Sequence, residues 1–259
     1  MKPFAPEMTT AHQVVGLYSF PKSGNTWLRA LIAALVGVPN DPGSLQRYLT
    51  DTHYGKVMEN PWSFNGADWY FYKSHHKQLL TEDEGQPFAT DKVIYIYRHP
   101  LDVFMSYLNF VSRNVSPKAG RSLPFQFDSV ESLTPEQFEE LFAIFCEHVT
   151  LFPQNRAFGS VFEHIDSFMA LKRSGLDVHV MRYEDLIEDF RLTARKMCLF
   201  LGFRGVNLKK VFEDADERTA RNGKFFWKRQ KDNYLNYLSS EQVNQFYTRH
   251  AVKMRELGY

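Results

Sequence analysis

The chain has 259 residues, of which 44% are hydrophobic and 24% are charged, and this ordinary globular composition excludes disordered and fibrous proteins. Its 31 Lys and Arg residues stand against 30 Asp and Glu residues, giving a formal net charge of +1. That balance gives no support for nucleic acid or an anionic membrane as a partner. The length suits one or two domains. We expect a single domain over residues 1–259, with a flexible N-terminus at residues 1–13.

No secretory or membrane-spanning segment is predicted. The first 13 residues lack a basic stretch followed by an apolar one, and the longest apolar stretch, residues 28–38, contains Arg29 and is too short to cross a bilayer. The two cysteines, Cys146 and Cys198, show neither a CxxC pattern nor zinc-like spacing. We expect buried free thiols in a reducing compartment, and hence a cytoplasmic protein.

Strands and helices are predicted to alternate along the chain. Short apolar or aromatic runs predict four buried strands, at residues 14–20, 69–73, 93–98 and 178–183. Apolar-rich segments between and after them predict helices at residues 27–36, 102–111 and 184–201. This alternation favours an α/β fold with a central, mostly parallel sheet flanked by helices.

Two further helices are predicted to begin with capping boxes. Thr134 and Ser239 are each followed three residues later by Gln, a pattern typical of helix starts.

Two long stretches show no regular pattern. Residues 112–133 contain Ser, Pro and Gly, and residues 204–233 are rich in charge. Irregular segments of this length are usually lids or binding segments, so we predict a lid at the first and a binding loop at the second.

The turn after the first predicted strand has the composition of an anion-binding loop. Residues 21–27 read PKSGNTW and lead directly into a helix, whose N-terminal N–H groups and dipole attract anions. Gly24 allows close approach of the backbone, Lys22 adds a charge, and Ser23 and Thr26 add hydroxyl groups. The lysine precedes the only glycine of the loop, unlike GxxxxGK[ST]. A kinase or ATPase is therefore disfavoured.

The same loop resembles the 5′-phosphosulfate loop of sulfotransferases that use 3′-phosphoadenosine 5′-phosphosulfate (PAPS), written PKSGTTW in the cytosolic branch, with Asn25 here in place of Thr. The resemblance implies a P-loop-like, phosphosulfate-binding loop after the first strand, with PAPS as co-substrate and 3′-phosphoadenosine 5′-phosphate (PAP) as product. It implies that the phosphosulfate is held by Lys22, Ser23, Gly24, Asn25 and Thr26. Trp27 is then expected to stack on adenine.

Three further segments extend the resemblance. Arg98, at a strand end, and Ser106, eight residues later, match the family's 3′-phosphate pair, and an Arg fork suits phosphate oxygens. Tyr183 matches a tyrosine that reaches the nucleotide. The run Arg221, Asn222 and Gly223 resembles the RKG loop that closes over the 3′-phosphate, with Asn222 replacing Lys. Residues 204–233 are accordingly expected to close over the nucleotide.

The catalytic base is expected to be a histidine, because its unperturbed pKa lies near neutrality. Lys73, Ser74 and His75 resemble the family's KTH segment, which implies His75 as the base and places Lys73 near the acceptor oxygen or sulfuryl group. Lys22 would stabilise the bridging oxygen as the S–O bond breaks. His99 is a second candidate for the base. The scheme requires no metal.

The expected acceptor is a small molecule with a hydroxyl group, or less favourably an amine, between Phe20 and Phe110. Two other functions remain open at this stage. One is a nucleotide kinase that uses ATP and Mg²⁺. The other is a module that binds 3′-phosphoadenosine nucleotides without turnover. The sequence leaves open both the acceptor and the choice between monomer and homodimer.

Overall fold

A computed structural model describes residues 12–53, 61–80, 89–112, 123–220 and 230–259. Its strands are β1 (His12–Tyr18), β2 (Leu49–Asp51), β3 (Trp62–Phe64), β4 (Ala67–Ser74), β5 (Lys92–Tyr97) and β6 (Asp177–Arg182). Its α-helices are α1 (Asn25–Val36), α2 (Ser44–Tyr48), α3 (Pro100–Ser112), α5 (Pro135–His148), α6 (Val161–Arg173), α7 (Tyr183–Glu188), α8 (Phe190–Phe200), α9 (Leu208–Ala220), α10 (Ser240–Arg249) and α11 (Ala251–Glu256). Two short 3₁₀ helices are η2 (Val130–Ser132) and η3 (Asn233–Asn236).

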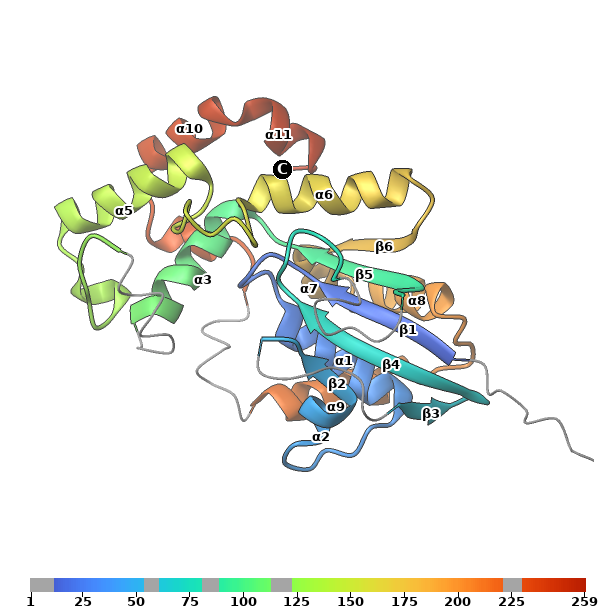
Figure 1. Ribbon diagram of the computed structural model, residues 1–259. Coiled ribbons are helices and arrows are strands. Elements are labelled where there is room, and N and C mark those ends of the chain that lie inside the picture. Colours follow the sequence, from blue (N-terminus) through green and yellow to red (C-terminus); the bar gives the residue numbers. More distant parts are fainter. Residues whose placement is uncertain (1–11, 54–60, 81–88, 113–122, 221–229) are drawn as a thin grey trace, which may run out of the picture.

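The six strands form one sheet, shown in Figure 1, with the order β2-β4-β1-β5-β6 and with β3 paired to β4. Every pair along this path is parallel, and only the β3–β4 pair is antiparallel. The predicted α/β fold with a mostly parallel sheet is confirmed. Because β1 lies between β4 and β5, the chain extends the sheet first to one side of β1 and then to the other. Such a reversal is where open α/β sheets bind ligands.

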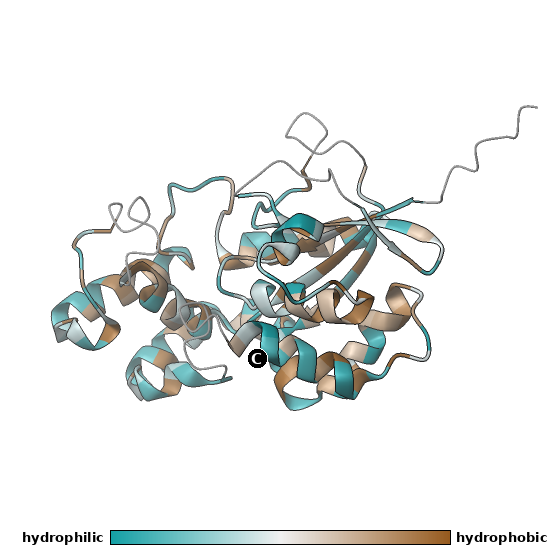
Figure 2. Ribbon diagram, turned by 90° about the horizontal axis from the view of Figure 1, so that it is seen from below, coloured by the Kyte–Doolittle hydropathy of each residue, from teal (hydrophilic) through white to brown (hydrophobic). Residues whose placement is uncertain are grey.

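The two faces of the sheet belong to two separate cores. Along β1, Val14 and Tyr18 pack into one cluster with α3, α5 and α6, whereas Val15 and Leu17 pack into the other with α1 and α8. This alternation follows from the period of two along a strand. Figure 2 shows hydrophobic and hydrophilic residues side by side on individual helices, as expected of helices that cover a sheet.

Several predicted boundaries are corrected by the structure. The segment 204–233 is not irregular throughout, because residues 208–220 form α9. The helix predicted through residue 201 is two helices, since Asp189 ends α7 and its side chain caps α8. In the expected lid, residues 130–132 form η2. The capping boxes at Thr134 and Ser239 are both present.

Candidate active site

The predicted phosphate loop, residues 21–27, joins β1 to α1, and no side chain caps the start of α1. Gly24 is the residue before the helix, with φ of 105°, and no side chain caps the helix there. A Cβ at Gly24 would lie 2.6 Å from the ring of Tyr183, so the position requires glycine for space as well as for conformation. Lys22 also has a positive φ, of 70°, and a non-glycine residue in that region is typical of functional loops. The uncapped N–H groups suit an anion.

Unpartnered buried atoms gather around this loop. Within the described residues, four buried side-chain polar atoms have no hydrogen-bond partner, and three of them belong to Ser23, Asn25 and Arg98. A buried polar atom without a partner costs free energy. A ligand with phosphate oxygens would supply acceptors for the hydroxyl of Ser23 and for Nε of Arg98.

Arg98 lies at the carboxyl end of β5, where three neighbours fix its guanidinium. Its Nη2 donates to the carbonyl of Gln230 at 2.7 Å and lies 3.3 Å from Asp102. Its guanidinium also lies over the ring of Tyr183, 4.6 Å from the centroid. Asp102 accepts hydrogen bonds from the N–H groups of Asp232 and Tyr234. Arg98 is thereby held beside the chain that follows residue 229.

Two lysines bring positive charge to the same edge of the sheet. Burial, reinforced by the charges of Arg98 and Lys73, lowers the pKa of Lys22 to about 7. Lys73 lies at the end of β4, and its Nζ is 2.7 Å from the carboxylate of Asp51 on the neighbouring strand β2. Burial lowers the pKa of Lys73, while Asp51 opposes the shift. The cluster therefore suits a polyanion, whose charge would restore full protonation of Lys22.

His75 follows the end of β4 and has a defined tautomer. Its Nδ1 lies 2.8 Å from the carbonyl oxygen of Ser19, and because a carbonyl only accepts, Nδ1 carries the proton. Nε2 is then the unprotonated nitrogen, which is the form that a general base needs. Burial, with the nearby charge of Lys73, lowers the pKa of His75 well below its usual range. The imidazole is therefore neutral at physiological pH.

The backbone of His75 is held from the other side by a histidine that the sequence did not single out. His164 lies on α6, donates from Nε2 to the carbonyl of His75 at 3.1 Å, and accepts at Nδ1 from the hydroxyl of Tyr95. Burial lowers the pKa of His164 to about 3. No sequence pattern connects these two histidines, because their contact depends on how α6 packs on the sheet.

His99, the second candidate for the base, has both ring nitrogens in hydrogen bonds. Its Nδ1 accepts from the N–H of Leu101, and its Nε2 lies 2.9 Å from the hydroxyl of Tyr247. The ring stacks on Tyr234 with centroids 4.5 Å apart, and burial lowers the pKa of His99 to about 3. This arrangement favours a structural role for His99.

The remaining residues that the sequence predicts to bind the nucleotide lie on neighbouring elements. Trp27 is 8% exposed and packs edge-on against Tyr183, with centroids 5.8 Å apart. The side-chain amide of Asn25 points into the protein, where it donates to Leu17 and Ser19. Ser106 lies in α3, partly exposed. The predicted Arg221, Asn222 and Gly223 lie outside the described residues.

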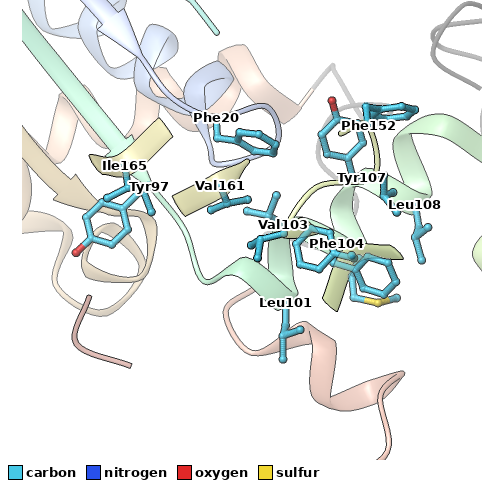
Figure 3. Packing of buried hydrophobic residues seen from close by; sticks show 14 of the residues in the cluster. Phe20, Tyr97, Leu101, Val103, Phe104, Tyr107, Leu108, Phe152, Val161 and Ile165 are labelled. Atoms are coloured by element: carbon cyan, nitrogen blue, oxygen red, sulfur yellow. The ribbon is translucent and has the colours of Figure 1, made fainter. Parts of the chain in front are cut away.

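Aromatic side chains lie beside the loop on the α3 side. Phe20 is buried against Tyr107, with ring centroids 6.1 Å apart, and Tyr107 in turn packs on Phe152 at 5.3 Å. Figure 3 shows Phe20, Tyr107 and Phe152 in this cluster. Nζ of Lys22 lies 4.6 Å from the ring centroid of Phe110. The two predicted acceptor residues are thus near the phosphate loop.

Comparison with known proteins decides the family. The sulfotransferase domain family matches residues 13–258. The chain belongs to the sulfotransferase family. This sulfotransferase is 25% identical over 275 residues to cytosolic sulfotransferase 14 of Arabidopsis thaliana, covering 89% of this chain and 72% of that protein. It is 24% identical over 200 residues to the 3-alpha-hydroxysteroid sulfotransferase of Cavia porcellus, covering 71% of this chain and 57% of that protein.

Solved structures share the fold of this sulfotransferase. A mouse sulfotransferase, SULT7A1, complexed with PAP has a TM-score of 0.57 and 20% identity, covering 94% of this chain and 84% of that one. Retinol dehydratase in a complex with retinol and PAP has a TM-score of 0.60 and 14% identity, with coverages of 93% and 81%. Among the described helices, none is both long and apolar enough to cross a membrane.

Proposed function

We propose that this sulfotransferase transfers the sulfuryl group of PAPS to a hydroxyl group, or less favourably an amine, of a small-molecule acceptor. The observation that carries the proposal is the convergence of Lys22, Lys73 and Arg98 with an uncapped helix start and two unpartnered buried donors. Its family membership and the PAP named in the complexes of two structural relatives support the same donor. Ser23, Gly24, Thr26 and the N–H of Asn25 would hold the phosphosulfate, and Arg98 and Ser106 the 3′-phosphate.

The proposed transfer is in-line. Nε2 of His75 accepts the proton of the acceptor hydroxyl while the oxygen of that hydroxyl attacks the sulfur of PAPS. The bond between sulfur and the bridging oxygen breaks, and Lys22 stabilises the negative charge that develops on the 5′-phosphate of PAP. The two negative charges of a bound phosphosulfate would raise the pKa of His75 toward neutrality. Lys73, held by Asp51, contributes charge near the sulfuryl group.

The acceptor is proposed to be an apolar or aromatic molecule that bears the hydroxyl. Phe20, Tyr107, Phe110 and Phe152 form a packed aromatic cluster beside the loop, which supports an apolar acceptor, and His75 lies edge-on to Phe158, with centroids 6.1 Å apart. Flat apolar ligands pack well against such aromatic walls.

Nucleotide selectivity tests the proposed donor site. PAP at 100 times its Kd should stabilise the protein by about 2.7 kcal/mol, and ADP or ATP with Mg²⁺ at the same concentration should stabilise it much less. Thermal unfolding measures the effect, and radiolabelled PAPS with a panel of phenols and alcohols then tests transfer. A preference for ATP would support a kinase instead. Binding of PAP without transfer to any acceptor would support a nucleotide-binding module.

Substitution of Arg98 should remove selectivity for the 3′-phosphate. Arg98→Ala should weaken PAP binding by roughly 10–150-fold, the loss of one hydrogen bond to a charged group, and should leave AMP binding nearly unchanged. Isothermal titration calorimetry of both nucleotides measures the difference. Arg195→Ala, at an exposed position of α8, is the matched control. An equal loss of affinity for PAP and for AMP would show that Arg98 does not bind the 3′-phosphate.

A further inference from the structure

Asn25 has a side chain that faces away from the bound anion expected at the loop. It is the first residue of α1 and is 4% exposed. Its Nδ2 donates to the carbonyl of Leu17 at 3.1 Å and to the hydroxyl of Ser19 at 3.2 Å. Because the Leu17 carbonyl only accepts, the nitrogen and not the oxygen of the amide must face it. Both amide protons are thus used to bind the end of β1.

Ser19 needs such a contact because it lies beyond the paired part of the sheet. The β1–β4 ladder ends at the pair Tyr18 and Ser74, so Ser19 and His75 are the first residues past it on either strand. Ser19 is fully buried. Its carbonyl oxygen accepts from Nδ1 of His75 at 2.8 Å, and its hydroxyl lies 3.4 Å from the same nitrogen.

We propose that Asn25 is a positioning residue that couples the phosphosulfate loop to His75: its amide fixes Ser19, and Ser19 fixes the tautomer and orientation of the imidazole. The inference rests on the proposed function, in which Nε2 of His75 is the base. Displacement of Ser19 would free Nδ1 and let the proton move to Nε2, the nitrogen that must be unprotonated for catalysis.

The threonine of the family pattern PKSGTTW cannot do the same. Threonine has a single hydroxyl proton and a shorter side chain, so it cannot donate to both Leu17 and Ser19. Asn25→Thr therefore restores the family's loop sequence while removing at least one of the two hydrogen bonds that join residue 25 to Leu17 and Ser19. The anion-binding N–H group of residue 25 is unaffected by this change.

The first test reads the tautomer directly and needs no acceptor. In ¹⁵N-labelled protein, the imidazole nitrogens of His75 are assigned by comparison with His75→Ala and are expected to report a proton on Nδ1. Asn25→Thr should shift His75 toward the Nε2–H form, whereas Asn236→Thr, at an exposed position, should not. An unchanged tautomer in Asn25→Thr would overturn the proposal. Titration with PAP checks that the variant is folded and that its donor site is intact.

The second test separates positioning from donor binding. Asn25→Thr should lower kcat by about tenfold, a scale set by the loss of one or two hydrogen bonds, and should shift the pH profile of kcat, with an unchanged Kd for PAP. In a His75→Ala background the same substitution should have no further effect on residual turnover. An equal loss in both backgrounds, or a loss confined to PAP affinity, would overturn the proposal. Failure of the wild-type protein to bind PAP or to transfer a sulfuryl group would instead contradict the proposed function. The effect of Asn25 on the tautomer of His75 would still be measured by the first test.

Discussion

Replacement of His75 by alanine should reduce turnover by about 10²–10⁴-fold, the usual contribution of a general base, with little change in the affinity for PAP. The reason is geometric. Nδ1 of His75 is committed to the carbonyl of Ser19, so Nε2 is left to accept a proton from the acceptor hydroxyl. The side chains proposed to bind the nucleotide come from other elements, so their positions are not expected to depend on the imidazole.

Single-turnover kinetics with PAPS measure the rate of transfer. Calorimetric titration with PAP measures the affinity for the nucleotide separately. His148→Ala, an exposed position at the end of α5, is the control for loss of a histidine. Because burial lowers the pKa of His75 below its ordinary value of 6.5 before the donor binds, kcat/KM for PAPS, which reports the free enzyme, should persist into mildly acidic conditions. Retained turnover in His75→Ala would remove His75 from the role of base.

Lys22→Ala should lower kcat by about 10²–10³-fold, as expected when one group that stabilises developing charge is removed, and should also weaken PAP binding. Lys22 is the charged side chain within the loop, and its Nζ lies 4.6 Å from the ring centroid of Phe110, a residue proposed to line the acceptor. Lys209→Ala, whose side chain is 85% exposed on α9, is the control. A loss of affinity with unchanged kcat would limit Lys22 to binding.

The affinity for PAP should also fall as the pH rises above about 7. Burial and two neighbouring cations lower the pKa of Lys22 to about 7. A bound anion would raise this pKa again, so binding should take up a proton at higher pH. The affinity should then fall by up to about tenfold per pH unit. Calorimetry at pH 8 in buffers of different ionisation enthalpy measures the proton uptake. Lys22→Arg, which stays charged, should abolish it, and uptake that persists in that variant would implicate another group.

The sequence predicted the parts of the fold that depend on local pattern. Strands β1, β4, β5 and β6 are apolar runs, and the loop after β1 carries its glycine, lysine and hydroxyls within seven residues. Strands β2 and β3 were missed because three residues are too few to show alternation. Helix α9 was also missed, although Leu208, Val211 and Ala215 recur at helical spacing among its many charged residues.

The supporting residues of the site depend on contacts between distant segments. Asp51 reaches Lys73 only because β2 pairs with β4 in a register that sets these two residues side by side. Asp102 fixes both Arg98 and the backbone at Asp232 and Tyr234. Nothing in the local sequence distinguishes such acidic residues from those on a solvated helix. Tertiary packing gives Asp51 its partner Lys73, and it gives Asp102 its backbone partners at Asp232 and Tyr234 in addition to the nearby Arg98.

The division of the core into two clusters places the aromatic residues proposed for the adenine and for the acceptor on opposite faces of the sheet. Trp27 and Tyr183 pack in the cluster beneath α1, whereas Phe20 and Tyr107 pack in the cluster beneath α3 and α6. Substitutions in the second cluster are separated from the first by the sheet, and distant substitutions act nearly independently. Substitutions of Phe20 or Tyr107, two residues proposed to line the acceptor, are therefore expected to leave the packing of Trp27 and Tyr183 nearly unchanged.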